Sequence, residues 1–283
     1  MEKNQYERII SSLENQGGLC ECGGVKMSKT LPEREEIIKI IRAVRYVMFP
    51  KLSAKPELYG DTLAQTLENV HGALYKQISL AVCDTALARR LTDGILEQLP
   101  DIKCALLKDV RAIYEGDPAA QSPDEVVLCY PGFTAIFVYR LAHEFYIRNI
   151  PYIPRIMTEY SHSVTGVDIH AGATIGEYFF IDHGTGIVIG ETATIGSHVK
   201  IYQGVTIGAK SFELDADGNP VKGIKRHPDI GDNCIIYANA TILGGNTRVG
   251  DGSVIGANVW LTASTPAGTK LYYTTATQKE DKK

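Results

Sequence analysis

An aliphatic side chain at every sixth residue from Val167 to Leu261 constrains the fold of this chain more than any other feature. The first ladder consists of Ile169, Ile175, Ile181, Ile187, Ala193, Val199 and Val205, and the second of Ile189, Ile195, Ile201 and Ile207. After a polar insertion the ladder resumes at Ile230, Ile236 and Ile242, and one extra residue near Gly245 shifts it to Val249, Ile255 and Leu261. Neither a helix, with a period of about 3.6, nor a strand, with a period of about 2, produces this spacing.

A hexapeptide repeat punctuated by glycine is the signature of a β-helix, in which each coil is a triangle of three short strands. The ladder side chains point inward and stack on those of the next coil, and glycine permits the tight corners. We therefore predict a β-helix over residues 159–265. The polar insertion SFELDADGNPVKGIK, residues 211–225, is predicted to be a loop ejected from the coil.

The preceding part of the chain has a helical pattern instead. Apolar side chains fall at helical spacing in three stripes, within residues 37–48, 102–113 and 133–145. We predict an α-helical domain over residues 1–158 and a polar carboxy-terminal tail over residues 266–283. The fold class is then α+β, with an amino-terminal helical domain followed by a hexapeptide β-helix.

Composition excludes several classes of protein. The formal net charge of −4 and the pI near 6.0 give no electrostatic reason to expect nucleic acid. No run of eighteen apolar residues is present, and the start MEKNQYERII lacks a secretory pattern, so we expect a cytoplasmic protein without a membrane span. The six cysteines are expected to be reduced. Cys20 and Cys22 have no second pair at ligand spacing, so no metal site is expected.

Because a β-helix core is chemically inert, function is expected at corners, on the ejected loop or between subunits. His183 is the strongest candidate for a general base, since Asp182 adjoins it and Asp168 is expected within roughly 10 Å. An acid beside an imidazole holds its tautomer and stabilises the cation formed during proton transfer. The alternative is a histidine that only hydrogen-bonds a corner carbonyl.

Two further polar groups lie near corners. Glu191 occurs in GETATIG, and Arg226 with His227 stands where the chain re-enters the coil after the ejected loop. An arginine and a histidine side by side suit a substrate carboxylate, because a guanidinium binds it in a bidentate manner.

The stretch DIHAGATIGEYFFIDHGTGIVIGETATIG (168–196), followed by VTIGA, KRHPDIGDN and NATILGG, resembles the serine O-acetyltransferase family. The segments GDPAA (116–120) and GFTAIFVYRLAH (132–143) extend the resemblance into the helical part. It implies transfer of acetyl from acetyl-CoA to the serine hydroxyl, at the entry to cysteine biosynthesis. It also implies a left-handed β-helix, trimers built by the β-helices and paired into hexamers through the helical domains, and active sites between neighbouring β-helices.

By motif match, the resemblance implies that His183 is the general base and Asp168 its orienting acid. Asp117 and Asp182 are implied to hold the serine ammonium. No cysteine or serine adjoins His183, so we expect direct transfer without an acyl-enzyme.

For the other end of the substrate, the resemblance implies that Arg226 and His227 hold the serine carboxylate, with Glu191 near the site. Acetyl-CoA is implied to lie along the groove between coils, beside small side chains that let its pantetheine arm approach the backbone, namely Ala209, Ala238 and Ala257. Acetyl-CoA is a co-substrate, and no permanently bound cofactor is expected.

The carboxy-terminal segment departs from the family pattern. AGTKLYYTTATQ (267–278) lacks the Gly-x-Pro-Ala-[Arg/Lys] stretch that helps to cover the CoA in relatives. Family members that dock onto O-acetylserine sulfhydrylase insert a terminal isoleucine, whereas this sequence ends at Lys283. We therefore expect no complex with that sulfhydrylase.

Three other functions remain open on the residues. One is an O- or N-acetyltransferase with the same coil that acts on a sugar or another small acceptor. Another is a metalloenzyme of the γ-carbonic-anhydrase kind, which needs three converging histidines from among His162, His170, His183 and His198. The last is an inert structural β-helix, which predicts no loss of activity when His183 is replaced.

Overall fold

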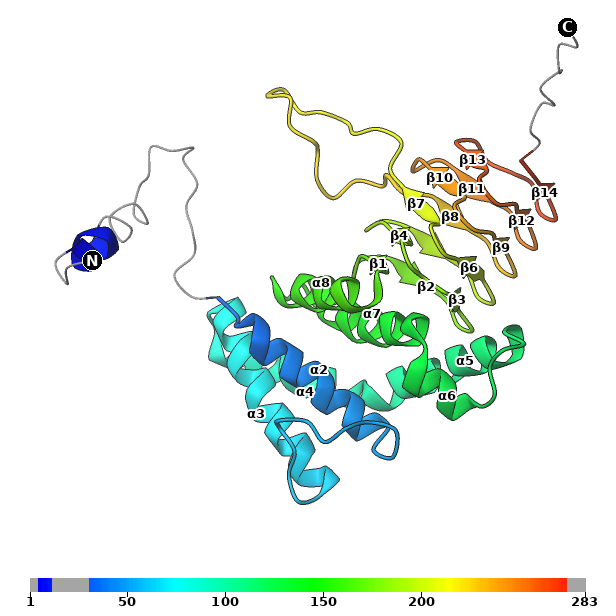
Figure 1. Cartoon of the computed structure of the whole chain (residues 1–283). Helices are drawn as coiled ribbons and strands as arrows, with labels where there is room; N and C mark the ends of the chain where they lie inside the picture. The colour runs from blue at the N-terminus through cyan, green and yellow to red at the C-terminus, as the bar shows by residue number, and fades with distance from the viewer. Residues whose placement is uncertain (1–4, 12–30, 274–283) are drawn as a thin grey trace, which may run out of the picture. The chain divides into compact units, whose positions relative to one another are not determined.

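The computed structural model describes residues 5–11 and 31–273. The chain consists of two compact units, Met1–Leu31 and Pro32–Lys283. In the first unit, residues 5–11 form a short helix. The second unit contains a helical part followed by a parallel β-helix (Figure 1). The prediction for Cys20 and Cys22 concerns residues outside the described ranges.

The predicted apolar stripes lie on three helices of the second unit. Its helices are α2 (Arg34–Met48), α3 (Leu63–Val82), α4 (Thr85–Glu97), α5 (Leu99–Gly116), α6 (Pro123–Cys129), α7 (Pro131–Ile147) and α8 (Ile153–Thr165). The stripes of α2, α5 and α7 are buried in one hydrophobic core that continues into the β-helix. Among the described residues no single helix is long and apolar enough to span a membrane. The pair α6 and α7, bent by 77°, reaches that length and composition only together, and most of α7 is buried.

The boundary between the two parts differs from the prediction, which placed it between residues 158 and 159. Helix α8 continues to Thr165 and ends at Gly166, whose φ of 71° closes the helix in the left-handed region. Pro154 stands in the first turn of α8. A proline there removes no intrahelical hydrogen bond, so the helix is not broken.

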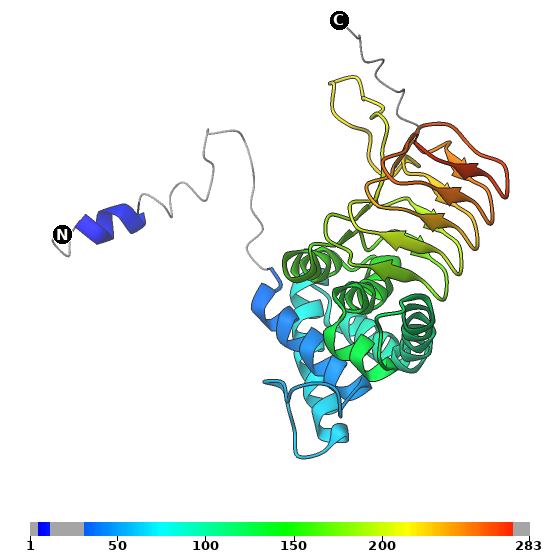
Figure 2. The same ribbon diagram turned by 45° about the vertical axis from the view of Figure 1, so that its right-hand side comes forward.

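The carboxy-terminal part is the predicted left-handed parallel β-helix, built of three parallel sheets (Figure 2). Sheet A contains β1 (Asp168–Ile169), β4 (Val188–Ile189), β7 (Thr206–Gly208), β10 (Thr241–Leu243) and β13 (Trp260–Leu261). Sheet B contains β2 (Thr174–Ile175), β5 (Thr194–Ile195), β8 (Asp229–Ile230) and β11 (Arg248–Val249). Sheet C contains β3 (Phe180–Asp182), β6 (Lys200–Tyr202), β9 (Ile235–Ile236), β12 (Val254–Ile255) and β14 (Lys270–Leu271).

The last strand extends the β-helix beyond the predicted end at residue 265. Strand β14 pairs with β12, so that Leu271 stacks on Ile255. The repeat is hard to see here because the position that pairs with the inward Val249 carries Thr265 rather than a large aliphatic side chain. Lys270 and Leu271, which were predicted to belong to the tail, are therefore part of the β-helix.

The inward ladder changes phase at one corner. Asp168 pairs with Val188, and Val188 pairs with Thr206, so the first coil is two residues longer than the second. The extra length lies in the turn from β3 to β4, which contains His183. The ladder that begins at Ile169 therefore continues through Ile189 and not through Ile187.

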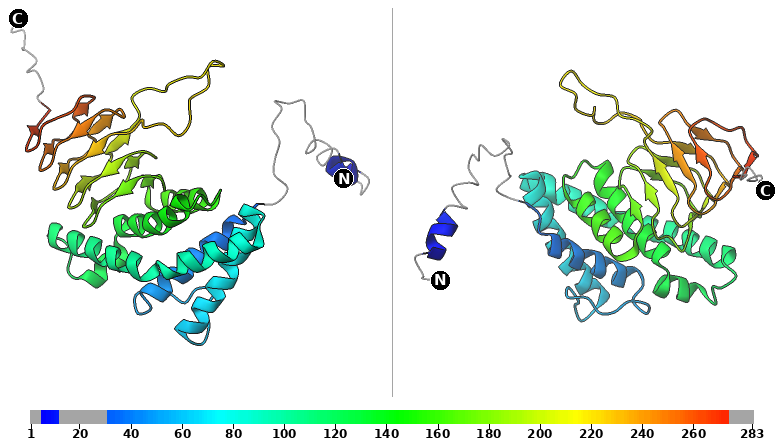
Figure 3. Two further views of the ribbon diagram at one scale, coloured as in Figure 1. Left: turned by 180° about the vertical axis from the view of Figure 1, so that it is seen from behind. Right: turned by 45° about the horizontal axis from the view of Figure 1, so that its top comes forward.

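Residues 211–225 leave the coil between β7 and β8, as Figure 3 shows for the arm that projects from the side of the β-helix. The arm carries its own antiparallel bridge between Leu214 and Pro220. Phe212 and Leu214 are exposed on it. We call the turn from sheet A to sheet B the A–B corner, and the turn from sheet C to sheet A the C–A corner.

Candidate active site

The first cluster of polar residues lies at the C–A corner of the first coil, where helix α5 ends against β3. We call Asp117, Tyr130, Asp182, His183 and Lys200 the His183 cluster. Asp182 is the last residue of β3, and His183 follows it with a φ of 58°. This left-handed turn leaves the imidazole 73% exposed, with Nε2 3.7 Å from Asp182 Oδ1. An accessible ring next to a carboxylate is suited to accepting a proton.

Asp117 is contributed by the helical part, as the residue that ends α5. Its Oδ1 accepts a hydrogen bond from the Ala119 N–H at 2.9 Å, and its Oδ2 accepts one from the Tyr130 hydroxyl at 2.7 Å. These two donors, together with the ammonium of Lys200, lower the pKa of Asp117. Burial and the same carboxylate raise the pKa of Tyr130 to about 12. Asp117 is therefore ionised at neutral pH, and Tyr130 is protonated.

Lys200 belongs to this cluster although the sequence analysis did not single it out. Its Nζ donates to the Gly116 carbonyl at 2.9 Å and lies 3.9 Å from Asp182 Oδ2. The same ammonium lies 4.2 Å from the centroid of the Phe180 ring. Lys200 in β6 pairs with Phe180 in β3, one coil earlier. This pairing cannot be predicted without the length of the corner between β3 and β4.

The second cluster lies at the A–B corner of the next coils. Arg226 Nη2 donates to Glu191 Oε2 at 2.5 Å, and the Tyr146 hydroxyl donates to Glu191 Oε1 at 2.8 Å. Burial acts to raise the pKa of Glu191, but these two donors outweigh it and the net shift is downward. Glu191 thus holds the guanidinium of Arg226 in place, beside the ejected loop.

His227 lies beneath this corner and only 7% of its surface is exposed. Its Nδ1 accepts a hydrogen bond from the Thr192 N–H at 3.0 Å, and its Nε2 would lie 2.1 Å from a Cβ placed on Gly190. Burial, together with the charge of Arg226, lowers the pKa of His227 to about 4. The ring is therefore neutral at pH 7, and it supports the corner rather than presenting a cation at the surface.

Asp168 lies at the start of β1 in sheet A, where its N–H donates to the Ile187 carbonyl at 2.9 Å. Within residues 5–11 and 31–273, no hydrogen bond or ion pair joins its carboxylate to His183. Its charge acts instead on His170, whose pKa is nevertheless lowered, mainly by burial. In a single chain the carboxylate beside His183 is that of Asp182, and the role of Asp168 as an orienting acid stays a prediction.

The structure thus divides the predicted site residues between two corners. Asp117, Asp182 and His183 meet at the C–A corner, whereas Glu191, Arg226 and His227 meet at the A–B corner. One face of sheet A lies between the corners, and six residues at about 3.3 Å each make that face roughly 20 Å wide. One serine is far too small to contact both clusters of the same chain.

The predicted CoA residues are divided in the same way. Ala238 and Ala257 lie in successive coils at the C–A corner, where the Asn258 N–H donates to the Ala238 carbonyl at 3.0 Å. Ala209 follows β7 and lies at the A–B corner. The two alanines of the C–A corner therefore lie on the edge that carries His183, and Ala209 lies on the edge that carries Arg226.

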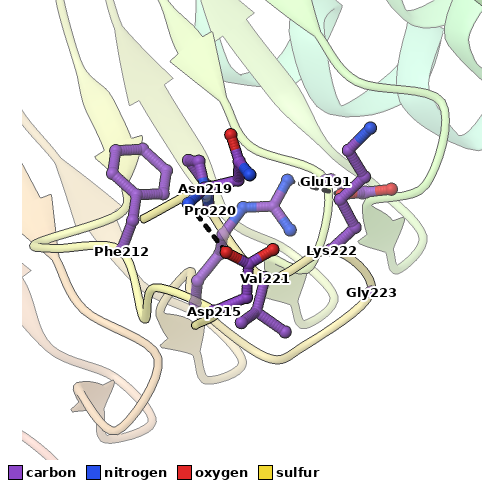
Figure 4. A pocket seen from close by; sticks show the side chains of 9 residues that line it. Glu191, Phe212, Asp215, Asn219, Pro220, Val221, Lys222 and Gly223 are labelled. Carbon is purple, nitrogen blue, oxygen red and sulfur yellow. Dashed lines mark hydrogen bonds and ion pairs between the residues drawn. The ribbon is translucent and has the colours of Figure 1, made fainter. Parts of the chain in front are cut away.

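A pocket of about 850 Å³ separates the ejected loop from the A–B corner. Its lining contains Glu191, Phe212, Asp215, Asn219, Pro220, Val221, Lys222, Gly223 and Arg226. Figure 4 shows Glu191 on the side of the coil and Phe212 on the loop. The loop therefore forms one wall of the space in front of Arg226. Over the described ranges, no group of three or more His, Cys, Asp or Glu side chains is placed to hold a metal ion.

Comparison with known proteins identifies relatives of this arrangement. A family model described as "Serine acetyltransferase, N-terminal" matches residues 54–137, and one described as "Hexapeptide repeat of succinyl-transferase" matches residues 229–263. The plasmid serine acetyltransferase of Synechococcus elongatus is 48% identical over 257 residues, which cover 84% of this chain and 80% of that relative. The serine acetyltransferase of Mycobacterium tuberculosis is 46% identical over 162 residues, which cover 57% of this chain and 66% of that protein.

Solved structures give the same result. Serine acetyltransferase 1 of Entamoeba histolytica, in complex with L-cysteine, matches with a TM-score of 0.76 and 39% identity over 83% of this chain and 86% of that one. The serine acetyltransferase of Neisseria gonorrhoeae in complex with serine matches with a TM-score of 0.57 and 29% identity, over 82% of this chain and 93% of that one. The likeness includes both the helical part and the β-helix.

Proposed function

Because this chain belongs to the serine acetyltransferase family, we propose that it transfers the acetyl group of acetyl-CoA directly to the hydroxyl of L-serine, in the first step of cysteine biosynthesis. The observation that carries this proposal is the exposed imidazole of His183 beside the carboxylates of Asp182 and Asp117. An ammonium held by two carboxylates places the neighbouring hydroxyl of an amino acid within reach of the ring.

His183 acts as the general base. Its Nε2 takes the hydroxyl proton while the serine oxygen attacks the thioester carbonyl carbon. The tetrahedral intermediate then collapses, the carbon–sulfur bond breaks, and the CoA thiolate takes the proton from the imidazolium. Asp182 Oδ1, at 3.7 Å, stabilises the imidazolium formed on the way. A positioned base typically contributes about 10²–10⁴-fold to the rate.

Arg226 of a neighbouring subunit holds the serine carboxylate. The separation of the two clusters within one chain supports this, because an oligomer can bring the A–B corner of one β-helix against the C–A corner of the next. We accordingly propose a trimer of β-helices, paired into a hexamer through the helical parts. Acetyl-CoA lies in the groove between subunits, along Ala238 and Ala257 of one chain and Ala209 of the other.

The reaction is proposed to occur in the cytoplasm. Four cysteines among the described residues carry free thiols, and three of them, Cys83, Cys104 and Cys129, are exposed. Exposed free thiols suit a reducing compartment. Acetyl-CoA enters as a co-substrate and leaves as CoA.

A thiol-release assay with acetyl-CoA and a panel of acceptors tests the proposed activity. The panel contains serine, homoserine, threonine and several sugars, and release of CoA is followed for each. We expect serine to be preferred by a wide margin, because the paired carboxylates and the guanidinium match both charged ends of a small zwitterion. Preference for a sugar would instead indicate an O-acetyltransferase for that class of acceptor.

A further inference from the structure

A buried ion pair connects the helical part to the β-helix just before the His183 cluster. Asp109 of α5 is completely buried, and its carboxylate accepts hydrogen bonds from Arg140 Nε at 2.5 Å and Nη2 at 2.8 Å. Asp109 Oδ1 also accepts one from the Phe179 N–H at 2.9 Å. Arg140 of α7, whose side chain is 11% exposed, donates in addition to the Gly176 carbonyl at 2.7 Å.

The partners of this pair lie directly before the proposed catalytic residues. Gly176 and Phe179 form the corner that precedes β3, and β3 ends at Asp182. On the helical side, Asp109 lies on the same helix as Asp117, eight residues earlier, or about 12 Å along the axis. The pair therefore links the segment that carries Asp182 and His183 to the helix that carries Asp117.

The end of α5 is closely packed against β3 and β6. A Cβ on Gly116 would lie 2.7 Å from the Phe180 ring, and the Gly116 carbonyl is held by Lys200. A shift of α5 along β3 would therefore move Asp117 relative to Asp182. The carboxylates that bind the ammonium come from different parts of the fold, so their separation depends on this junction.

The free-energy cost of burying the two charges suggests that the pair fixes geometry rather than adding stability. Removing two charges from water has a large free-energy cost, and an apolar pair of similar volume is often as stable. Burial indeed raises the pKa of Asp109 despite its hydrogen bonds. A bidentate arginine–carboxylate contact adds geometric specificity in addition to energy.

We propose that the Asp109–Arg140 pair is a positioning element of the serine site, which fixes α5 against the first coil so that Asp117 stands beside Asp182 and His183. This proposal rests on the proposed function, since it assigns the serine ammonium to Asp117 and Asp182. Asp109 and Arg140 touch neither substrate, and they act only through the placement of Asp117.

A double-mutant cycle with the full-length enzyme tests this role. The variants are Asp109→Asn/Arg140→Gln, Asp117→Asn and the combination of all three changes. We expect the pair variant to raise the KM for serine roughly tenfold or more, because a misplacement of about 1 Å can cost up to about 100-fold. The KM for acetyl-CoA should stay nearly unchanged. In the Asp117→Asn background the pair variant should add no further increase, although sites this far apart normally act additively.

Two controls keep a loss of stability separate from a loss of positioning. The partly buried pair Glu144–Arg148 joins the last turn of α7 to the residue that follows it, and it makes no hydrogen bond or ion pair to the β-helix in the described structure. Glu144→Gln/Arg148→Gln should leave both KM values unchanged. Asp109→Leu/Arg140→Met provides a second, apolar pair variant if the first one folds poorly.

An unchanged KM for serine in a folded pair variant would overturn the positioning role, and so would the same fold-increase in the Asp117→Asn background. The failure of the proposed function gives a different result. In that case Asp117→Asn by itself leaves the KM for serine unchanged, and the assignment of the ammonium site falls together with the positioning role.

Discussion

The residue on which the proposed chemistry depends is His183, a non-glycine residue in the left-handed region. Its φ of 58° turns the chain sharply after β3 and directs the ring outward next to Asp182. Histidine tolerates this conformation better than β-branched residues do. The strained corner and the exposed ring therefore result from the same backbone turn.

Replacement of His183 by alanine should lower kcat about 10²–10⁴-fold, because the hydroxyl proton then has no positioned acceptor. The thiol-release assay at saturating substrates measures this. His162→Ala is a matched control, since His162 is an exposed histidine of α8 whose acidic neighbour, Glu159, lies on the same helix. Undiminished kcat in His183→Ala would show that another group accepts the proton.

His227 gives a prediction about stability and pH. Its pKa is about 4 in the folded protein and near 6.5 when the chain is unfolded. Between these values the unfolded chain binds a proton that the folded chain does not, so the free energy of unfolding falls as the pH falls. The loss should be about 2 kcal/mol between pH 6.5 and 5, and it should be absent above pH 7.

Urea unfolding at pH 7 and pH 5 measures this loss, with His227→Asn as the comparison. Asparagine keeps an acceptor for the Thr192 N–H but does not titrate in this range. The difference between the two pH values should therefore be smaller in the variant. Equal pH dependence in both proteins would show that other groups cause the acid loss.

At the scale of elements, the glycines differ in how much space surrounds the position of a side chain. Gly190 opens the A–B corner of the second coil, and the His227 ring occupies the space where its side chain would be. Gly72, in contrast, lies exposed inside α3 with nothing within 4 Å of an added Cβ. Glycine is thus required by packing at one position and by nothing in the structure at the other.

Gly190→Ala should lower the free energy of unfolding by about 1–3 kcal/mol, because the added methyl group overpacks the corner and displaces His227. Gly72→Ala should raise it by about 0.5–1 kcal/mol, since alanine is the better helix former. Thermal unfolding at one protein concentration compares the two with the wild type. If Gly190→Ala unfolds with the same free energy as the wild type, the corner must be able to shift and accommodate the methyl group.

At the scale of the whole molecule, the separation of the two clusters predicts complementation between inactive subunits. His183→Ala and Arg226→Ala should each be nearly inactive alone. In mixed trimers formed by co-expression, about one quarter of the interfaces should combine an intact His183 with an intact Arg226. The mixture should therefore regain about that fraction of wild-type activity.

A mixture of His183→Ala and Asp182→Ala serves as the control, because both residues lie on the C–A corner of the same chain. No interface in it has an intact His183 cluster, so it should stay inactive. Equal activity of the two mixtures would contradict a site shared between subunits.

The fold class was predictable because most inward positions of the β-helix recur at a spacing of six residues along the chain. Neither a helix nor an ordinary strand has a six-residue period, so this spacing indicates a β-helix. The apolar stripes of α2, α5 and α7 were predictable from the 3.6-residue period of a helix. His183 and Asp182 were recognisable from the motif that contains them. Helix α8 continues beyond the predicted boundary at residue 158 to Thr165, and a proline in the first turn of a helix, such as Pro154, does not interrupt it.

The amino-acid sequence by itself thus determined the repeating coil, the helical part and the residue types available for chemistry, since these depend on neighbours along the chain. Only the tertiary structure decided the register across the long corner after β3, the burial of His227 and the meeting of Asp117 and Lys200 with Asp182. Those features depend on the length of corners and on the packing of α5 against β3. Neither property can be predicted from the spacing of apolar residues. The division of the site residues between two corners has the same origin, because the positions of corners in space follow from how the coils stack.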